Sequence, residues 1–219
     1  EIFAATLDVV ETTETEARGY RADSTIPVVT EDELRAAGNI YPDWILDRYL
    51  QLPESTPERL LVLARELTAT EPTPYDRARA IERYLREFPY NLDVPYAPPG
   101  RDIADFFIFD LQEGYCDYYA TSMVVLARAA GLPARLVVGY ASGSYDAETA
   151  RYIVTEADAH AWAEIYFPTY GWIEFEPTAA LEVLDRASEE DTARLEEGEE
   201  IEPLVPPSED ETEFRLGRW

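Results

Sequence analysis

The sequence contains no lysine, so all 18 of its basic residues are arginine. They stand against 45 acidic residues, which gives a formal net charge of −27. Nucleic acid is therefore excluded as a partner, because phosphate binding requires clustered basic side chains. The same imbalance disfavours direct adsorption to an anionic membrane surface. The absence of lysine itself is typical of a compositional bias of the genome or habitat.

Cysteine and long apolar runs are also scarce. A single cysteine cannot form an internal disulfide, so cysteine usage does not decide the redox compartment. No run of 18 or more apolar residues is present, and no secretory signal is recognisable, so we predict no membrane-spanning segment within this chain. The chain starts at Glu1 rather than at methionine, and we expect it to be a piece of a longer protein.

Metal and cofactor signatures are missing as well. One cysteine and one histidine are too few for a typical zinc site. The acidic residues do not form the twelve-residue loop with alternating aspartates that binds calcium. We therefore predict neither a metal nor a cofactor.

The composition supports one packed core with two appendages. Hydrophobic residues make up 46% of the 219 residues, which suffices for a single core. We predict an N-terminal extension of strands and short helices at residues 1–54, with strands or extended arms in residues 1–29. The core is expected at residues 55–180. Residues 181–219 are rich in Glu, Asp and Pro and predict an acidic tail or linker.

Helices are expected first and strands afterwards. Thr30 and Glu33 have the spacing of a capping box, a helical segment is expected at 44–50, and Pro57 is expected in the first turn of the next helix. Apolar residues with a period of 3.6 predict further helices at 73–88, ended by Pro89, and at 116–130. Between them lies an irregular loop, followed by an apolar segment at 105–109. Strands are predicted at residues 135–140, 152–155, 159–167 and 172–176, with a turn at 142–144, which indicates an α+β fold.

The only cysteine, Cys116, is expected at the first turn of a helix that is apolar almost all round and therefore buried. Backbone N–H groups and the helix dipole favour negative charge at that point. Both favour the thiolate, which is the nucleophilic form of a cysteine. Taken alone, a cysteine in this position is more often a small buried hydrophobe, since free cysteine is among the most buried residue types.

The only histidine, His160, lies near the start of a predicted strand. One face of this strand carries Ala159, Ala161 and Ala163, which permit close approach of another element. The other face carries His160 and Trp162, together with Glu164. Histidine serves as an acid, a base or a plain structural residue, so its position alone does not decide its role.

Glu176 is the candidate carboxylate. If the turn pairs Tyr166 with Trp172, Glu176 lies opposite Trp162 and is a diagonal neighbour of His160 on the same face. Its carboxylate is then expected to accept from Nδ1–H of the imidazole and to leave Nε2 for the thiol. A register slip of one residue would place the two side chains on opposite faces.

Two other acids have the same parity along their strands, namely Glu174 and Asp158, and they are rivals for this orienting role. Together, Cys116, His160 and a carboxylate match a Cys-His-acid triad. The residues alone therefore leave the third member open among these three acids.

The chain resembles the bacterial transglutaminase-like domains, which have a papain-like fold. The matching blocks are GYCDYYA at 114–120, AAGLPAR at 129–135 with Gly139-Tyr140, DAHAWAE at 158–164 and GWIEFEPT at 171–178. The resemblance spans roughly residues 55–180 and is greatest to the TgpA-like branch. It implies a central Cys-bearing helix packed on an antiparallel sheet.

The resemblance also implies the roles of the residues. Cys116 would be the nucleophile, His160 the base and Glu176 the carboxylate, where the family usually has Asp. The backbone N–H of Cys116 is expected to stabilise the oxyanion. Tyr115, Gln112 and Trp162 are candidates for a second oxyanion donor or for substrate contacts.

The implied reaction is acyl transfer from a carboxamide of a protein or peptide through a thioester. An amine acceptor gives a crosslink, and water gives hydrolysis or deamidation. Without lysine, the domain cannot modify itself at Lys. The resemblance further implies an extracytoplasmic domain tethered to the membrane through segments outside this chain, with its oligomeric state left open. A cysteine peptidase and a catalytically weak binding module remain as alternatives.

Overall fold

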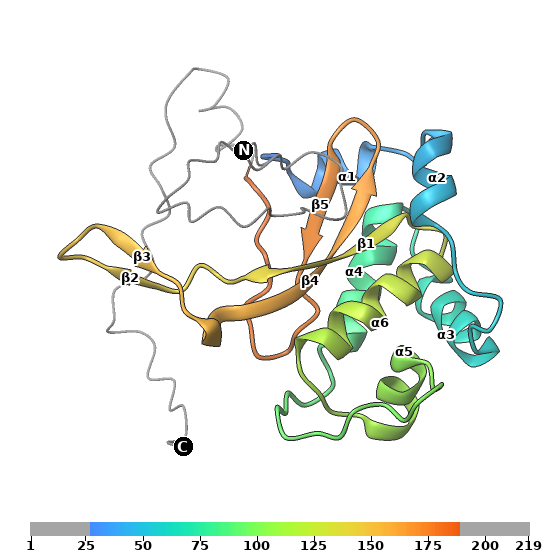
Figure 1. The fold of residues 1–219 in the computed structure, drawn as a ribbon. Coiled ribbons are helices and arrows are strands. Elements are labelled where there is room, and N and C mark those ends of the chain that lie inside the picture. The colour runs from blue at the N-terminus through green and yellow to red at the C-terminus, as the bar shows by residue number, and fades with distance from the viewer. Residues whose placement is uncertain (1–26, 189–219) are drawn as a thin grey trace.

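The computed structural model describes residues 27–188, which form a set of helices followed by an antiparallel sheet (Figure 1). The strands or arms predicted in residues 1–29 lie almost wholly outside the described residues, as does most of the acidic tail predicted from residue 181. Residues 27–29 and 181–188 contain no helix or strand. The proposed boundaries of the three segments therefore stay predictions.

Four helices lie between residues 27 and 89: α1 (Glu31–Ala36), α2 (Asp43–Tyr49), α3 (Glu58–Thr68) and α4 (Pro74–Leu85). The predicted capping box of α1 is confirmed. The hydroxyl of Thr30 accepts from the backbone N–H of Glu33 at 3.2 Å, and the Glu33 carboxylate accepts from the N–H of Thr30 at 2.8 Å. These bonds satisfy donors that every helix start leaves without an intrahelical partner.

Two predicted helix boundaries were wrong by a few residues. Pro57 is the N-cap of α3, without a side-chain cap bond, rather than a residue of its first turn. Helix α4 ends at Leu85 and not at Pro89. The chain tightens there into a turn in which the N–H of Phe88 donates to the carbonyl of Leu85 at 3.2 Å, so the helical ladder stops before the proline is reached.

The apolar segment predicted at 105–109 is helical. Helix α5 (Ile103–Phe106) continues into a single π-helical turn, η1 (Phe107–Leu111). Gln112 ends this turn in the left-handed region with φ 59°, and its N–H donates to the carbonyl of Phe107 at 2.8 Å. The reversal directs the chain toward Cys116.

Helix α6 (Cys116–Ala129) is the central helix. Its buried residues are Tyr118, Tyr119, Ala120, Ser122, Met123, Val124, Leu126 and Ala127. Gly131 follows it with φ 81°, a left-handed conformation that glycine adopts without the steric cost of a Cβ atom. The expectation of a buried helix that begins at the cysteine is confirmed.

The main sheet is antiparallel with strand order β1-β4-β5, formed by β1 (Ala134–Tyr140), β4 (Ala159–Phe167) and β5 (Gly171–Phe175). Tyr166 pairs with Trp172, which confirms the predicted register. Helix α6 packs against β4 and β1, so helices cover one face of the sheet (Figure 1).

A small hairpin between β1 and β4 was only partly anticipated. Ser144 was predicted in a turn, but it begins β2 (Ser144–Asp146), which pairs with β3 (Arg151–Ile153). The hairpin projects away from the helices (Figure 1). A short 3₁₀ turn, η2 (Glu156–Asp158), leads from it into β4. The pattern of strand β2 is too short to be recognised by alternation alone.

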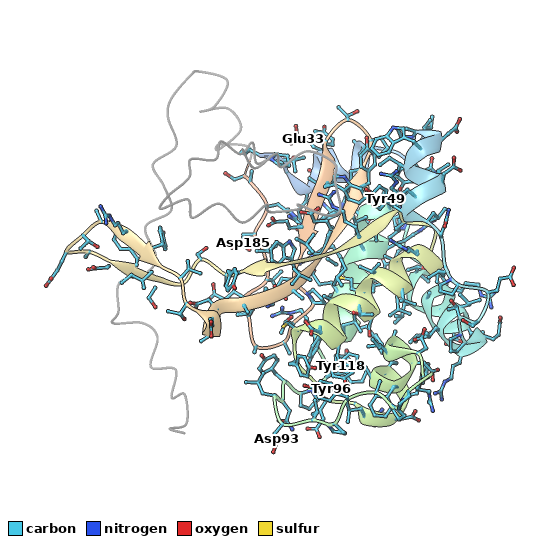
Figure 2. All side chains as sticks on the ribbon, in the orientation of Figure 1. Glu33, Tyr49, Asp93, Tyr96, Tyr118 and Asp185 are labelled. Atoms are coloured by element: carbon cyan, nitrogen blue, oxygen red, sulfur yellow. The ribbon has the colours of Figure 1, made fainter. Side chains whose placement is uncertain are left out.

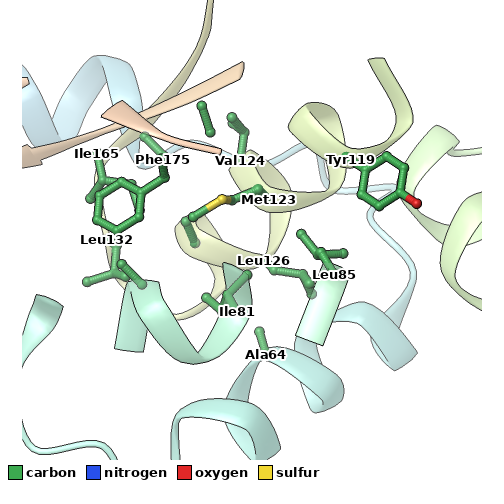
Figure 3. Packing of buried hydrophobic residues seen from close by; sticks show 14 of the residues in the cluster. Ala64, Ile81, Leu85, Tyr119, Met123, Val124, Leu126, Leu132, Ile165 and Phe175 are labelled. Carbon is green, nitrogen blue, oxygen red and sulfur yellow. The ribbon is translucent and has the colours of Figure 1, made fainter. Parts of the chain in front are cut away.

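The two faces of β4 differ as the sequence predicts. Ala161 and Ala163 are buried beneath the helices, whereas His160 and Trp162 are half-buried on the opposite face. Small side chains under α6 let the helix and sheet approach closely, as dense core packing requires. Figure 3 shows the resulting core, which includes Ile81 and Leu85 of α4, Met123 and Leu126 of α6, and Ile165 and Phe175 of the sheet.

Candidate active site

Three separate elements bring the predicted triad residues together. Cys116 is the first residue of α6, His160 is the second residue of β4, and Glu176 directly follows β5. Nε2 of His160 lies 2.6 Å from Oε2 of Glu176. Hydrogen bonding to Cys116, and then to Glu176, raises the pKa of His160 to about 9, although burial acts in the opposite direction. The only histidine therefore interacts with both of its predicted partners.

The orientation of the imidazole is the reverse of the prediction. Glu176 faces Nε2, so Nδ1 is the ring nitrogen left for the thiol. Glu176 directly follows β5 and is a diagonal neighbour of His160 on β4, so both side chains extend from the same face of the sheet. In this arrangement the two side chains make contact through their outermost atoms, and Nε2 is the imidazole nitrogen farther from the backbone.

The rival acids have other surroundings. The carboxylate of Asp158 closes the turn at η2, where Oδ2 accepts from the backbone N–H of Thr155 at 2.6 Å. Glu174 lies opposite Glu164 in the sheet, and burial raises the pKa of Glu174. Of the three carboxylates with the required parity, the structure places Glu176 against the imidazole.

The first turn of α6 leaves backbone donors beside the thiol. Tyr115 is the N-cap residue in an extended conformation, and it forms no side-chain cap bond. The first N–H groups of a helix have no carbonyl partner within the helix. The N–H of Cys116 is therefore oriented by the helix and is suited to a developing negative charge nearby.

Asp117 is a neighbour of the thiol that the sequence reasoning did not consider. It is exposed, and its Oδ1 lies 3.8 Å from Sγ of Cys116. The carboxylate accepts from the thiol, and it places a negative charge next to a group that would itself become an anion. Its signal in the sequence was an acidic residue in the first turn of the helix.

Trp162 lies against the imidazole on the same face of β4. The two rings are stacked with centroids 6.0 Å apart and an interplanar angle of 17°. The indole Nε1 is buried without a hydrogen-bond partner. Gly139, which pairs with His160, makes room for the indole, because a Cβ atom there would lie 3.1 Å from the Trp162 ring.

The other two candidates lie on the loop side of α6. Tyr115 is half-buried, and its ring contacts Tyr118 edge to face with centroids 5.1 Å apart. Gln112 is exposed at the end of η1. Figure 2 shows Tyr118 near Tyr96, with Asp93 at the outer edge of the loop that precedes α5. This side of the site is thus lined mainly by tyrosine rings.

Tyr90 also borders the site and was missed. It forms an isolated β-bridge with Gly114, two residues before Cys116. Burial raises the pKa of Tyr90, and the charges of Cys116 and Glu176 act in the same direction. Residues 90–93 line an open hollow of about 490 Å³. A bridge between residues 24 positions apart is a tertiary contact with no local signal.

Within residues 27–188, no group of three or more His, Cys, Asp or Glu side chains is arranged to hold a metal ion. No helix in this part of the chain is long and apolar enough to cross a membrane. His160 instead has a carboxylate 2.6 Å from its Nε2 and a thiol whose hydrogen bonding raises the pKa of the imidazole. This set can move protons and form a covalent bond to carbon.

Comparison with known proteins relates this geometry to a family. The chain is 41% identical over 169 residues to the Bacillus subtilis uncharacterized protein YebA, covering 73% of this chain and 23% of that protein. It is 39% identical over 133 residues to a Pseudomonas aeruginosa protein-glutamine gamma-glutamyltransferase, covering 60% of this chain and 20% of that enzyme. The chain thus spans less than a quarter of the length of these curated relatives.

A solved structure shares the fold. The periplasmic domain of TgpA from Pseudomonas aeruginosa aligns with a TM-score of 0.56 and 35% identity, over 63% of this chain and 48% of that chain. The observed order of a Cys-bearing helix followed by an antiparallel sheet is the α+β architecture of the papain-like fold. The profile of the Transglutaminase-like superfamily matches residues 62–177, and this chain belongs to that superfamily.

Proposed function

We propose that this chain catalyses cysteine-dependent acyl transfer from carboxamides of proteins or peptides through a thioester on Cys116. The observation that carries the proposal is the position of the only histidine, which interacts with the only cysteine and lies 2.6 Å from a buried glutamate. A relative that is 39% identical is a protein-glutamine gamma-glutamyltransferase, which supports a glutamine side chain as the acyl donor.

The protonation state of His160 suits the first step. A pKa of about 9 keeps the imidazole protonated at neutral pH, with Glu176 on Nε2. The Cys116 thiolate attacks the carbonyl carbon and forms the S–C bond. As the C–N bond breaks, Nδ1 of His160 gives its proton to the departing nitrogen, which leaves as ammonia or an amine.

The second step restores the enzyme. The now neutral imidazole takes a proton from an incoming amine or water, whose nitrogen or oxygen attacks the thioester carbon. The S–C bond breaks and the thiolate forms again beside the imidazolium. Glu176 stabilises the positive charge of His160 at the start and end of the cycle, as the acid of a triad does.

The developing oxyanion has one donor on α6 and one candidate on the sheet. The backbone N–H of Cys116 is the donor that the helix start provides. The indole Nε1 of Trp162 is the second candidate, because it is buried next to His160 and lacks a partner. A donor of this kind, when lost, costs about 10²–10³ in kcat.

We further propose that the chain is an extracytoplasmic domain, tethered to the membrane through segments outside it, that acts on a protein or peptide substrate. The similarity to the periplasmic domain of TgpA supports this location. The greater length of the curated relatives leaves room for such segments.

The test incubates the chain with a glutamine-containing peptide and a fluorescent amine, and it compares the wild type with Cys116→Ala. We expect the wild type to release ammonia and to incorporate the amine or deamidate the glutamine, and Cys116→Ala to do neither. Cleavage of the peptide backbone would instead identify a peptidase. Absence of every product would contradict the proposal and favour a binding module.

A further inference from the structure

The backbone of Glu176 needs partners that the sheet does not supply. The last residue pair between β4 and β5 joins Ala163 to Phe175, so Glu176 lies one residue beyond the ladder. It is nevertheless buried, with 6% of its surface exposed. Buried backbone N–H and C=O groups without partners cost free energy comparable to a lost hydrogen bond. Another element must therefore hold this residue.

Helix α4 and its C-cap residue, Arg86, supply both partners through two side chains. Oε1 of Glu82 accepts from the N–H of Glu176 at 3.0 Å, and Nη1 of Arg86 donates to the carbonyl of Glu176 at 2.8 Å. Glu82 and Arg86 are four residues apart and therefore lie on the same side of the helix. Glu82 and Arg86 bind the backbone N–H and C=O of Glu176, which lies at least 90 positions further along the sequence.

The guanidinium of Arg86 also holds the segment that follows. It donates to the carbonyl of Thr178 at 2.8 Å and to that of Leu181 at 2.5 Å. The N–H of Thr178 in turn donates to Oε1 of Glu176 at 2.9 Å, while Oε2 faces the imidazole. Both carboxylate oxygens and both backbone groups of Glu176 are thus engaged.

Glu82 is an unusual residue for a helix core. Its side chain is 1% exposed, and among residues 27–188 its one ion pair is with Arg79. Burial raises the pKa of Glu82, and the charges of Arg79, Arg186 and Arg86 oppose this effect. Burying a carboxylate is costly unless it is paired and hydrogen-bonded, and an apolar residue would pack there at less cost. The carboxylate of Glu82 is needed there as the acceptor for the backbone N–H of Glu176.

We propose that Glu82 and Arg86 are positioning residues, which fix the backbone at residue 176 so that the Glu176 carboxylate reaches Nε2 of His160. A glutamate has one more rotatable bond than an aspartate, so its carboxylate stays in one place only when the backbone and the carboxylate oxygens are both held. Misplacement by about 1 Å is enough to cost about 10²-fold in rate. The catalytic meaning of this inference rests on the proposed acyl transfer, whereas its structural content does not.

The test uses the only histidine as a reporter, since its NMR titration is unambiguous. The variants are Glu82→Met and Arg86→Met, with Glu176→Gln as the reference for a lost carboxylate. We expect the pKa of His160 to fall in both variants, from about 9 toward the value in Glu176→Gln. In the amine-incorporation assay, kcat should fall by about 10–100-fold with KM little changed.

Conservative variants keep the inference testable if a methionine variant does not fold. Glu82→Gln retains an acceptor for the N–H of Glu176 and should titrate close to the wild type. Arg86→Lys replaces the guanidinium, which donates through two nitrogens, by a single ammonium. It should lower the pKa of His160 less than Arg86→Met does. Arg83→Met is the matched control, because the side chain of Arg83 is 68% exposed on the same helix.

The outcomes separate the two proposals. A lower pKa of His160 in the folded Glu82 and Arg86 variants, with no change in Arg83→Met, supports positioning even if the wild type transfers no acyl group. An unchanged titration in folded Glu82→Met and Arg86→Lys would overturn it, whatever the activity. An equal shift in Arg83→Met would also overturn it, because the effect would then be a general one of the helix.

Discussion

Glu176 meets His160 at the outer nitrogen of its ring, with Oε2 2.6 Å from Nε2, although the two residues start from different strands. The carboxylate is buried and accepts a second bond from the backbone of Thr178. The distance is short for a hydrogen bond, as is typical when both partners carry charge. This contact leaves Nδ1 to face the thiol and defines the direction in which the predicted triad would pass protons.

Shortening or neutralising this carboxylate should reduce catalysis by different routes. Glu176→Gln removes the charge that stabilises the imidazolium, and we expect kcat/KM to fall by about 10²–10⁴-fold. Glu176→Asp keeps the charge, but the backbone is held by α4, so the shorter side chain should not reach Nε2. We expect a loss smaller than that of the glutamine variant, measured by amine incorporation. Full activity in Glu176→Asp would contradict the fixed backbone.

The raised pKa of His160 predicts a pH dependence of stability. The pKa of His160 is higher in the folded protein than the ordinary histidine value of about 6.5, so the folded state binds the proton more tightly. The stabilising contribution is therefore fully present below about pH 6.5 and is lost as the pH rises through about 9. The measurement is the free energy of unfolding by urea, compared with His160→Gln at pH 6, 8 and 10. We expect the stability difference between the wild type and His160→Gln to shrink as the pH rises, and a difference that grows would contradict the raised pKa.

Asp117 should restrain the reactivity of the thiol. Its carboxylate lies 3.8 Å from Sγ of Cys116, and a like charge disfavours the thiolate. Asp117→Asn should therefore raise the rate of alkylation by iodoacetamide at pH 6–7, by about two- to tenfold since the residue is exposed and solvent screens the interaction. His160→Gln should lower the same rate. A slower reaction in Asp117→Asn would show that the carboxylate activates the thiol instead.

The core around α6 predicts a large contrast between two apolar substitutions. Met123 is fully buried between α6, α4 and the sheet, and Met123→Ala should destabilise the fold by about 2–5 kcal/mol (Figure 3). Val138 is 73% exposed on β1, and Val138→Ala should change stability by less than about 0.5 kcal/mol. Urea unfolding of both variants tests the pair. Similar effects at the two sites would mean that the described core is not the one that stabilises the chain.

Local signals predicted much of the fold. The capping box at Thr30, the start of α6 at Cys116 and the register that pairs Tyr166 with Trp172 were all recoverable from residue type and spacing. The signals failed where elements are short or strained. The β2 strand has three residues, and the π-helical turn η1 has a local geometry that propensity does not encode.

Residue type and periodicity predicted that a lone cysteine begins a buried helix and that Glu176, Glu174 and Asp158 have the parity needed to reach the face of His160. The three-dimensional packing was needed to show that Nε2 of His160 contacts the carboxylate and that Glu82 holds the backbone of Glu176. Side-chain reach depends on the twist and spacing of neighbouring strands. The hydrogen bonds from Glu82 and Arg86 to the backbone of Glu176 join parts of the chain about 90 residues apart, and no local pattern specifies such a contact.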